Sequence, residues 1–178
     1  MKKKYIIIFI LKFFIILIFI YLVIEKQKSS TNNEKTELEF IHKLAILGLE
    51  NFDKGMNQTE DIELKKHYER IYEADPETFR DKVFNNNLST ASTLLIYSTI
   101  DFLSQKLEKK INLKVNKIDC YTSFFSFKNE IINLELKNSN DHFFINKPND
   151  TLGDGYCFFH AITYLLNEIM PNWKSKFN

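Results

Sequence analysis

The stretch of sequence that bears most on the fold reads Gly153-Asp154-Gly155-Tyr156-Cys157-Phe158-Phe159-His160-Ala161-Ile162. It holds two of the four glycines of the chain, and glycine lets the backbone turn sharply and approach another group closely. Apolar side chains then recur at helical spacing up to Pro171, at positions Phe158, Ile162, Leu165 and Ile169. We therefore expect a tight turn, followed by an apolar, central helix that begins at Cys157.

A cysteine at the start of a helix has a chemical consequence. The first turn presents unpaired N–H groups and a partial positive charge, which stabilise a thiolate and lower the pKa of Cys157. The same N–H groups can hold the oxyanion that forms when a thiolate attacks a carbonyl. A thiol nucleophile at a helix start, behind a tight turn, is the arrangement of papain-like hydrolases. The alternative is an ordinary buried cysteine at the beginning of a helix.

Residues 154–162 resemble the nucleophile motif of the ovarian-tumour (OTU) family of cysteine proteases, and the resemblance extends over residues 153–166. That motif reads Asp-Gly-x-Cys, then two large apolar residues, then Arg or His, then a small residue. Tyr156 stands where most members have Asn. The resemblance implies a deubiquitinase-type thiol isopeptidase, whose partner is ubiquitin or a ubiquitin-like modifier.

The resemblance also implies a role for each motif residue. Cys157 would be the nucleophile, and Asp154 would shape the loop whose N–H groups form the oxyanion hole. His160 matches a position that the family uses structurally. The remaining motif positions are Gly153, Gly155, Tyr156, Phe158, Phe159 and Ala161.

The family places its general-base His on a late strand, far downstream of the nucleophile, whereas this sequence ends at Asn178. We therefore expect residues 147–178 to be the incomplete start of an OTU-like domain, truncated and inactive as the 178-residue chain. We also expect the helix from Cys157 to lack the sheet that a papain-like core packs around it.

Residues 5–24 are apolar except for Lys12 and follow Lys2-Lys3-Lys4. At about 1.5 Å per residue a helix of that length spans roughly 30 Å, the hydrocarbon thickness of a bilayer. We predict that residues 1–28 form a transmembrane or signal-anchor segment that contacts the lipid bilayer through residues 5–24, with a single-pass membrane localisation. A cleaved signal followed by secretion is the alternative, and a buried soluble helix is a third possibility.

Between the two ends lie a polar linker at 29–35 and a mainly helical region of unknown role at 36–146. The apolar spacing predicts helices at 36–54, 60–74, 75–84 and 89–110, and strands at 111–115 and 142–145, with 131–136 either strand or helix. The predicted fold class is α+β and mostly helical. His42 and His67 lie alone on predicted helices, where we expect surface or packing roles.

The charge distribution bears on partners. The formal net charge is +1, but residues 1–28 carry Lys2, Lys3, Lys4, Lys12, Lys26 and Lys28 against Glu25 alone, so the rest of the chain is net acidic. A mildly acidic body without a basic stripe argues against nucleic acid as a partner. Cys120 and Cys157 could form at most one disulfide, and Cys120 has no basic neighbour to activate it.

No Cys/His cluster has zinc spacing, and we expect neither a metal nor a cofactor. Two alternatives to a protease remain. One is a non-catalytic, membrane-anchored helical interaction protein, and the other is a pseudoenzyme that binds ubiquitin without cleaving it.

Overall fold

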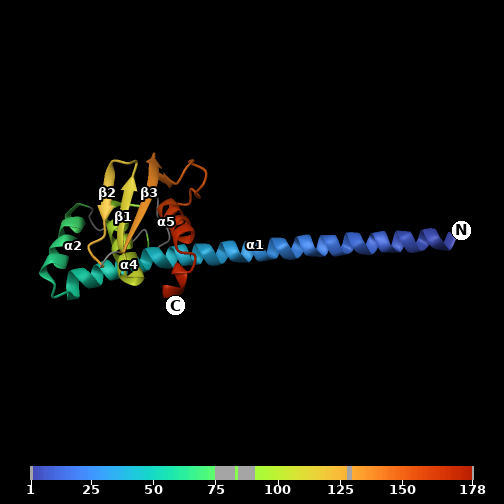
Figure 1. The fold of residues 1–178 in the computed structure, drawn as a ribbon, viewed down its shortest axis with the longest axis horizontal. Coiled ribbons are helices and arrows are strands. Elements are labelled where there is room, and N and C mark those ends of the chain that lie inside the picture. The colour runs from blue at the N-terminus through green and yellow to red at the C-terminus, as the bar shows by residue number, and fades with distance from the viewer. Residues whose placement is uncertain (1, 75–82, 84–90, 128–129, 178) are drawn as a thin grey trace. The chain divides into compact units, whose positions relative to one another are not determined.

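The computed structural model describes residues 2–74, 83, 91–127 and 130–177, without side chains for 2–17, 23–24, 27–33 and 73–74. The chain divides into two compact units, residues 1–40 and residues 41–178. The described elements follow one another as α1 (Lys2–Gln58), α2 (Ile62–Ala74), α4 (Thr93–Leu107), β1 (Lys110–Val115), β2 (Asp119–Thr122), β3 (Ile131–Ser139), β4 (His142–Phe144), α5 (Cys157–Ile169) and the 3-10 helix η1 (Trp173–Phe177) (Figure 1).

The first unit consists of the N-terminal part of α1. Our prediction of a transmembrane or signal-anchor helix is corrected here, because no helix in the described part of the chain is long and apolar enough to cross a bilayer. The side chains of 5–17 and 23–24, within the predicted membrane segment, lie outside the described residues.

The predicted linker at 29–35 also differs from the structure, in which these residues continue α1. Polarity alone does not end a helix. Proline is the residue that interrupts a helix most strongly, and the first proline of the chain is Pro76. The helix predicted to begin at Thr36 is therefore the later part of α1.

The second unit is an α+β body built on a mixed four-stranded sheet with the strand order β2-β1-β3-β4. β1 pairs with β2 in antiparallel register (Leu113 opposite Tyr121) and with β3 in parallel register (Leu113 opposite Leu134). β4 pairs with β3 in antiparallel register and forms an edge of the sheet. The predicted strands at 111–115 and 142–145 are confirmed, 131–136 is a strand, and β2 was not predicted.

Alternation along β3 shows why this segment is a strand rather than a helix. Ile132, Leu134 and Leu136 are buried, while the residues between them are exposed. This is the period-two pattern of a strand with one face on the core. Beside the sheet in Figure 1, α4 contacts β1 and β2, and α5 contacts β3 and β4.

The helices predicted from apolar spacing are largely confirmed. Of the apolar face that the spacing predicts for 36–54, Ile41, Ala45, Leu49 and Phe52 are fully buried in α1, whereas Leu38 is only partly buried. The helix expected at 60–74 is α2, whose first N–H groups bond to the Asp61 carboxylate, and the helix expected at 89–110 is α4, capped by Ser92. The helix predicted at 75–84 lies outside the described residues except for Val83.

The helix from Cys157 does have a sheet to pack on, which corrects our expectation. Phe158, Phe159 and Ile162 are all fully buried. Phe158 meets Phe143 of β4 edge to face, with ring centroids 5.4 Å apart. The partner surface comes from strands that precede the helix in sequence, so it does not depend on any downstream segment.

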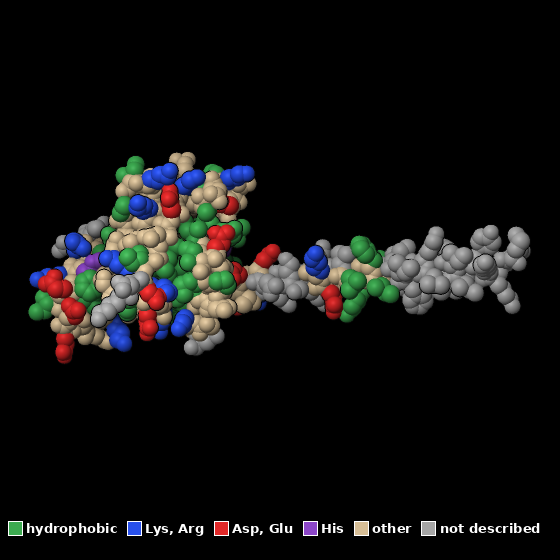
Figure 2. Space-filling model, viewed as in Figure 1, with side chains coloured by type: hydrophobic (Ala, Val, Ile, Leu, Met, Phe, Trp, Pro, Cys, Tyr) green, Lys and Arg blue, Asp and Glu red, His purple; other side chains and the backbone are tan. Residues whose placement is uncertain are grey.

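The outer face of α5 keeps some apolar surface. Its exposed large hydrophobic side chains are Tyr164 and Ile169, and hydrophobic side chains are visible at the surface over this helix in Figure 2. Beyond α5, Trp173 of η1 is buried and donates from Nε1 to Oδ1 of Asn167 at 2.8 Å. This contact holds the end of the described chain against the body.

Candidate functional site

The turn before α5 is held by the Asp154 carboxylate. Its Oδ1 accepts the backbone N–H of Tyr156 at 2.9 Å. Gly155 has φ of 85°, a left-handed conformation that favours glycine over any residue with a Cβ. The turn makes Cys157 the first residue of α5. By contrast, a Cβ added at Gly153 would meet open space, and its φ is not positive, so the geometry does not demand glycine there.

The same carboxylate reaches into the first turn of α5. Its Oδ2 lies 2.9 Å from Nε2 of His160. Asp154 thus binds the loop with one oxygen and the helix with the other, and His160 supports the loop rather than facing the thiol. A single residue therefore fixes how the turn enters the helix.

The Cys157 side chain is buried, with 2% of its surface exposed. Its Sγ accepts the backbone N–H of Phe143 at 3.3 Å, and the S–H group faces the carbonyl oxygen of Asp141 at 3.9 Å. Both partners flank His142 in β4. The Phe143 carbonyl accepts a hydrogen bond from Oγ1 of Thr151 at 2.5 Å. The thiol and the Thr151 hydroxyl thus satisfy the polar groups along the edge of β4.

Burial raises the pKa of the Cys157 thiol above its ordinary value. The N–H groups of Phe143 and Phe158 act in the opposite direction, and the negative charge of Asp154 adds to the rise. We expected the helix start to lower this pKa, and that expectation is wrong. The first turn does supply an N–H group to the sulfur. However, the free-energy cost of removing a thiolate from water exceeds the stabilisation that these N–H groups provide.

Each histidine near Cys157 is engaged with another group. Nε2 of His142 lies 2.6 Å from the carbonyl oxygen of Pro148, and the His42 ring packs on Tyr156 at 4.3 Å between centroids. His160 is bound to Asp154. Among the described residues, no histidine nitrogen is within hydrogen-bond distance of the Cys157 sulfur. The sulfur therefore has backbone partners and no base.

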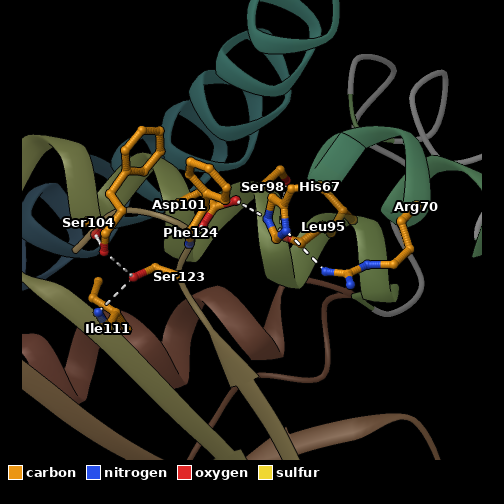
Figure 3. Close-up of polar contacts among 10 residues, drawn as sticks. His67, Arg70, Leu95, Ser98, Asp101, Ser104, Ile111, Ser123 and Phe124 are labelled. Atoms are coloured by element: carbon orange, nitrogen blue, oxygen red, sulfur yellow. Dashed lines mark hydrogen bonds and ion pairs between the residues drawn. The ribbon is translucent and has the colours of Figure 1, made fainter. Parts of the chain in front are cut away.

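A second cluster of polar groups lies between α2 and α4 (Figure 3). Asp101 of α4 is fully buried, and its Oδ1 accepts the backbone N–H of Phe124 at 2.7 Å. Its Oδ2 lies 3.0 Å from Nε2 of His67 in α2. Burial raises the pKa of the Asp101 carboxyl, while the bonds from His67 and Phe124 oppose the rise. These contacts link α2, α4 and the residues after β2.

The contact of His67 with its other neighbour indicates which ring nitrogen accepts a hydrogen bond. Nη2 of Arg70 lies 3.4 Å from Nδ1 of His67. A guanidinium group only donates hydrogen bonds, so Nδ1 is the acceptor and the ring proton sits on Nε2, which donates to Asp101. Sequence reasoning gave His67 a packing role and did not single out Asp101. The available signal was a carboxylate within the apolar run Ile100-Asp101-Phe102-Leu103.

His67 also lines a cavity of about 360 Å³, together with Glu63, Lys66, Arg70 and Phe124. Within the described part of the chain, no group of three or more His, Cys, Asp or Glu side chains is placed to hold a metal ion. Comparisons of the chain with protein-family models, with curated proteins and with solved structures found no match.

Proposed function

We propose that residues 147–178 are the nucleophile-bearing part of an OTU-like cysteine protease, a thiol isopeptidase that acts on ubiquitin or a ubiquitin-like modifier. In this proposal Cys157 is the nucleophile, Asp154 shapes the oxyanion loop and His160 supports that loop. We further propose that the chain of 178 residues is catalytically silent.

The observation that carries the proposal is the turn from Asp154 to Cys157. The Asp154 carboxylate bonds the Tyr156 N–H and the His160 ring, Gly155 has a positive φ, and Cys157 then begins α5. Asp154, Tyr156 and His160 are thus bonded to one another, and Gly155 and Cys157 complete a turn of five motif residues. A cysteine with a chance likeness to the motif would not need an acidic residue and a histidine that hold one another.

The surroundings of the Cys157 thiol support the proposal that the chain is catalytically inactive. The sulfur is buried and bonded to the backbone of β4, and its pKa is raised. Nucleophilic attack requires the thiolate and a base that takes the thiol proton. A neutral thiol without a histidine in contact meets neither requirement.

The buried thiol also favours a second function, the binding of ubiquitin without cleavage. Such a pseudoenzyme would retain the loop and helix that carry the motif, because they shape the surface around Cys157. Binding would then survive replacement of the nucleophile, whereas covalent chemistry would not.

Both functions are tested by incubating the full chain with ubiquitin that carries a C-terminal thiol-reactive electrophile. We expect a slow covalent adduct at Cys157, because the electrophile captures even a small thiolate fraction without needing a base. Below the raised thiol pKa the adduct rate should increase about tenfold per pH unit, in proportion to the thiolate. Mass spectrometry of the digested adduct identifies the modified residue.

Cys120→Ser serves as the matched control and should form the adduct at the wild-type rate, whereas Cys157→Ser should form none. Saturable ubiquitin binding without any adduct would establish the pseudoenzyme in place of the protease. The absence of both adduct and binding, or an adduct confined to Cys120, would overturn the proposed function.

A further inference from the structure

The cavity beside His67 presents positive charge from one face of α2. Lys66 and Arg70 line it, and they are one helical turn apart and so lie on the same side of the helix. Of the carboxylates that the structure describes, Glu63 alone lines it, and it pairs with Lys66 at 3.1 Å. Both of these side chains are more than half exposed, and a surface pair of this kind is weak and exchangeable.

Arg70 has no carboxylate partner among the residues that the structure describes, and its Nη2 contacts Nδ1 of the His67 ring. A guanidinium group offers five N–H donors in a planar fork that matches the oxygens of a carboxylate or phosphate group. Toward the described part of the chain, most of these donors are therefore available to an anion in the cavity.

His67 supplies a fixed third group. Its ring is held from behind by buried Asp101 and from the side by Phe124, whose ring centroid lies 5.1 Å away. The Nδ1 edge faces Arg70 (Figure 3). The histidine cannot rotate freely, so the wall of the cavity is set before any ligand arrives, which reduces the entropy lost on binding.

We propose that this cavity binds the phosphoryl group of a small phosphate monoester. The Arg70 guanidinium group donates hydrogen bonds to two phosphate oxygens. Lys66 exchanges its contact with Glu63 for one with a third oxygen, and the organic part of the ligand packs on the Phe124 ring. The volume of about 360 Å³ accommodates a phosphate and an attached ring. This site shares no residue with the turn at Asp154, so it is independent of the proposed protease function.

The test titrates the full chain with phenyl phosphate and with inorganic phosphate at constant ionic strength, by calorimetry and by NMR of the His67 ring nitrogens. We expect saturable binding of both, tighter for phenyl phosphate because of Phe124, and a change in the Nδ1 resonance as Arg70 moves. Arg70→Ala should weaken binding by about tenfold or more, since it removes charge-assisted bonds. The affinity of Arg70→Lys for phenyl phosphate should lie between that of the wild type and that of Arg70→Ala.

Lys65→Ala is the matched control, because Lys65 is exposed on the same helix and does not line the cavity. It should bind phenyl phosphate as the wild type does, and so should Cys157→Ala. Equal losses in Lys65→Ala and Arg70→Ala would show that only the general charge of α2 attracts the anion and would overturn the site. Binding that never saturates, or an unchanged His67 resonance, would do the same.

Discussion

The Cys157 thiol lies where two physical effects oppose each other. The N–H groups of Phe143 and Phe158 point at the sulfur and stabilise its charge, while burial penalises that charge. Burial is the larger effect, so the pKa rises and the thiol is neutral. The burial depends on β4, whose edge the sulfur covers.

The exposure of the two cysteines gives a direct measurement at the residue scale. Cys120 is exposed and Cys157 is buried, so we expect iodoacetamide to modify Cys120 in the folded chain at least about tenfold faster. In concentrated urea the two rates should become equal, because the difference comes from the fold. Peptide mass spectrometry at timed intervals measures both sites in one sample. Faster modification of Cys157 at pH 6–7 would instead indicate a primed thiolate.

Sequence reasoning at this scale succeeded for local features and failed for distant ones. The tight turn and the helix start at Cys157 follow from Gly155 and from apolar spacing within a few residues, and both were predicted. The sign of the pKa shift depends on the burial of the thiol, and the backbone of Asp141 and Phe143 reaches the sulfur only after β4 joins the sheet. No pattern within the motif indicates that contact.

Among the elements, α2 is attached to the body through a small number of buried contacts. His67 reaches Asp101 of α4, and Tyr68 is fully buried against Phe52 of α1, with ring centroids 4.8 Å apart. Gly55 allows this approach, because a Cβ at that position would come within 2.1 Å of the Tyr68 ring. The helix itself was predicted at 60–74 from its apolar spacing. Its attachment through Asp101 was not, because it joins residues far apart in sequence.

Replacement of Asp101 tests that attachment. Asp101→Ala should lower the free energy of unfolding by about 2–3 kcal/mol, because the Phe124 N–H and the His67 Nε2–H lose a buried acceptor. Asp101→Asn keeps an acceptor and should cost less. Urea denaturation measures both variants. Asp119→Ala, at an exposed position in β2, is the control and should change stability by no more than about 0.5 kcal/mol.

The pH dependence of these variants has a definite sign. Because the folded pKa of Asp101 is raised, the folded state holds its proton at a pH where the unfolded chain has lost it. Stability should therefore fall as pH rises from the unfolded carboxyl pKa through the folded pKa. Asp101→Asn should lack this fall. An identical pH profile for wild type and Asp101→Asn would contradict the assigned shift.

For the whole molecule, the buried hydrophobic side chains all belong to the second unit. Among the described residues they run from Ile41 in α1 to Trp173 in η1. A domain folds when its own residues bury enough apolar surface to offset the entropy of ordering the chain. The buried hydrophobic side chains described for this body all lie within residues 41–178, and because α1 runs through both units, no break in the sequence pattern marks the boundary.

A fragment of residues 36–178 should therefore fold on its own. Cutting before Thr36 leaves a Thr-x-x-Glu sequence, Thr36 to Glu39, that can cap the new helix start. We expect one cooperative urea transition, with a free energy of unfolding within about 1 kcal/mol of that of the full chain. Circular dichroism follows the helices and Trp173 fluorescence follows the core, and coincident curves would establish a single unit.

The matched fragment 36–152 ends before the turn and lacks α5 and η1. It should not fold cooperatively, because Phe158, Phe159, Ile162 and Trp173 would be absent from the core and β4 would lose the groups that cover its edge. A cooperative transition in 36–152 would mean that the motif helix is an appendage of the body. If 36–152 shows no cooperative transition, the residues that resemble a protease nucleophile are also required to complete the fold. The chemistry of Cys157 and the stability of the body then cannot be separated by truncation.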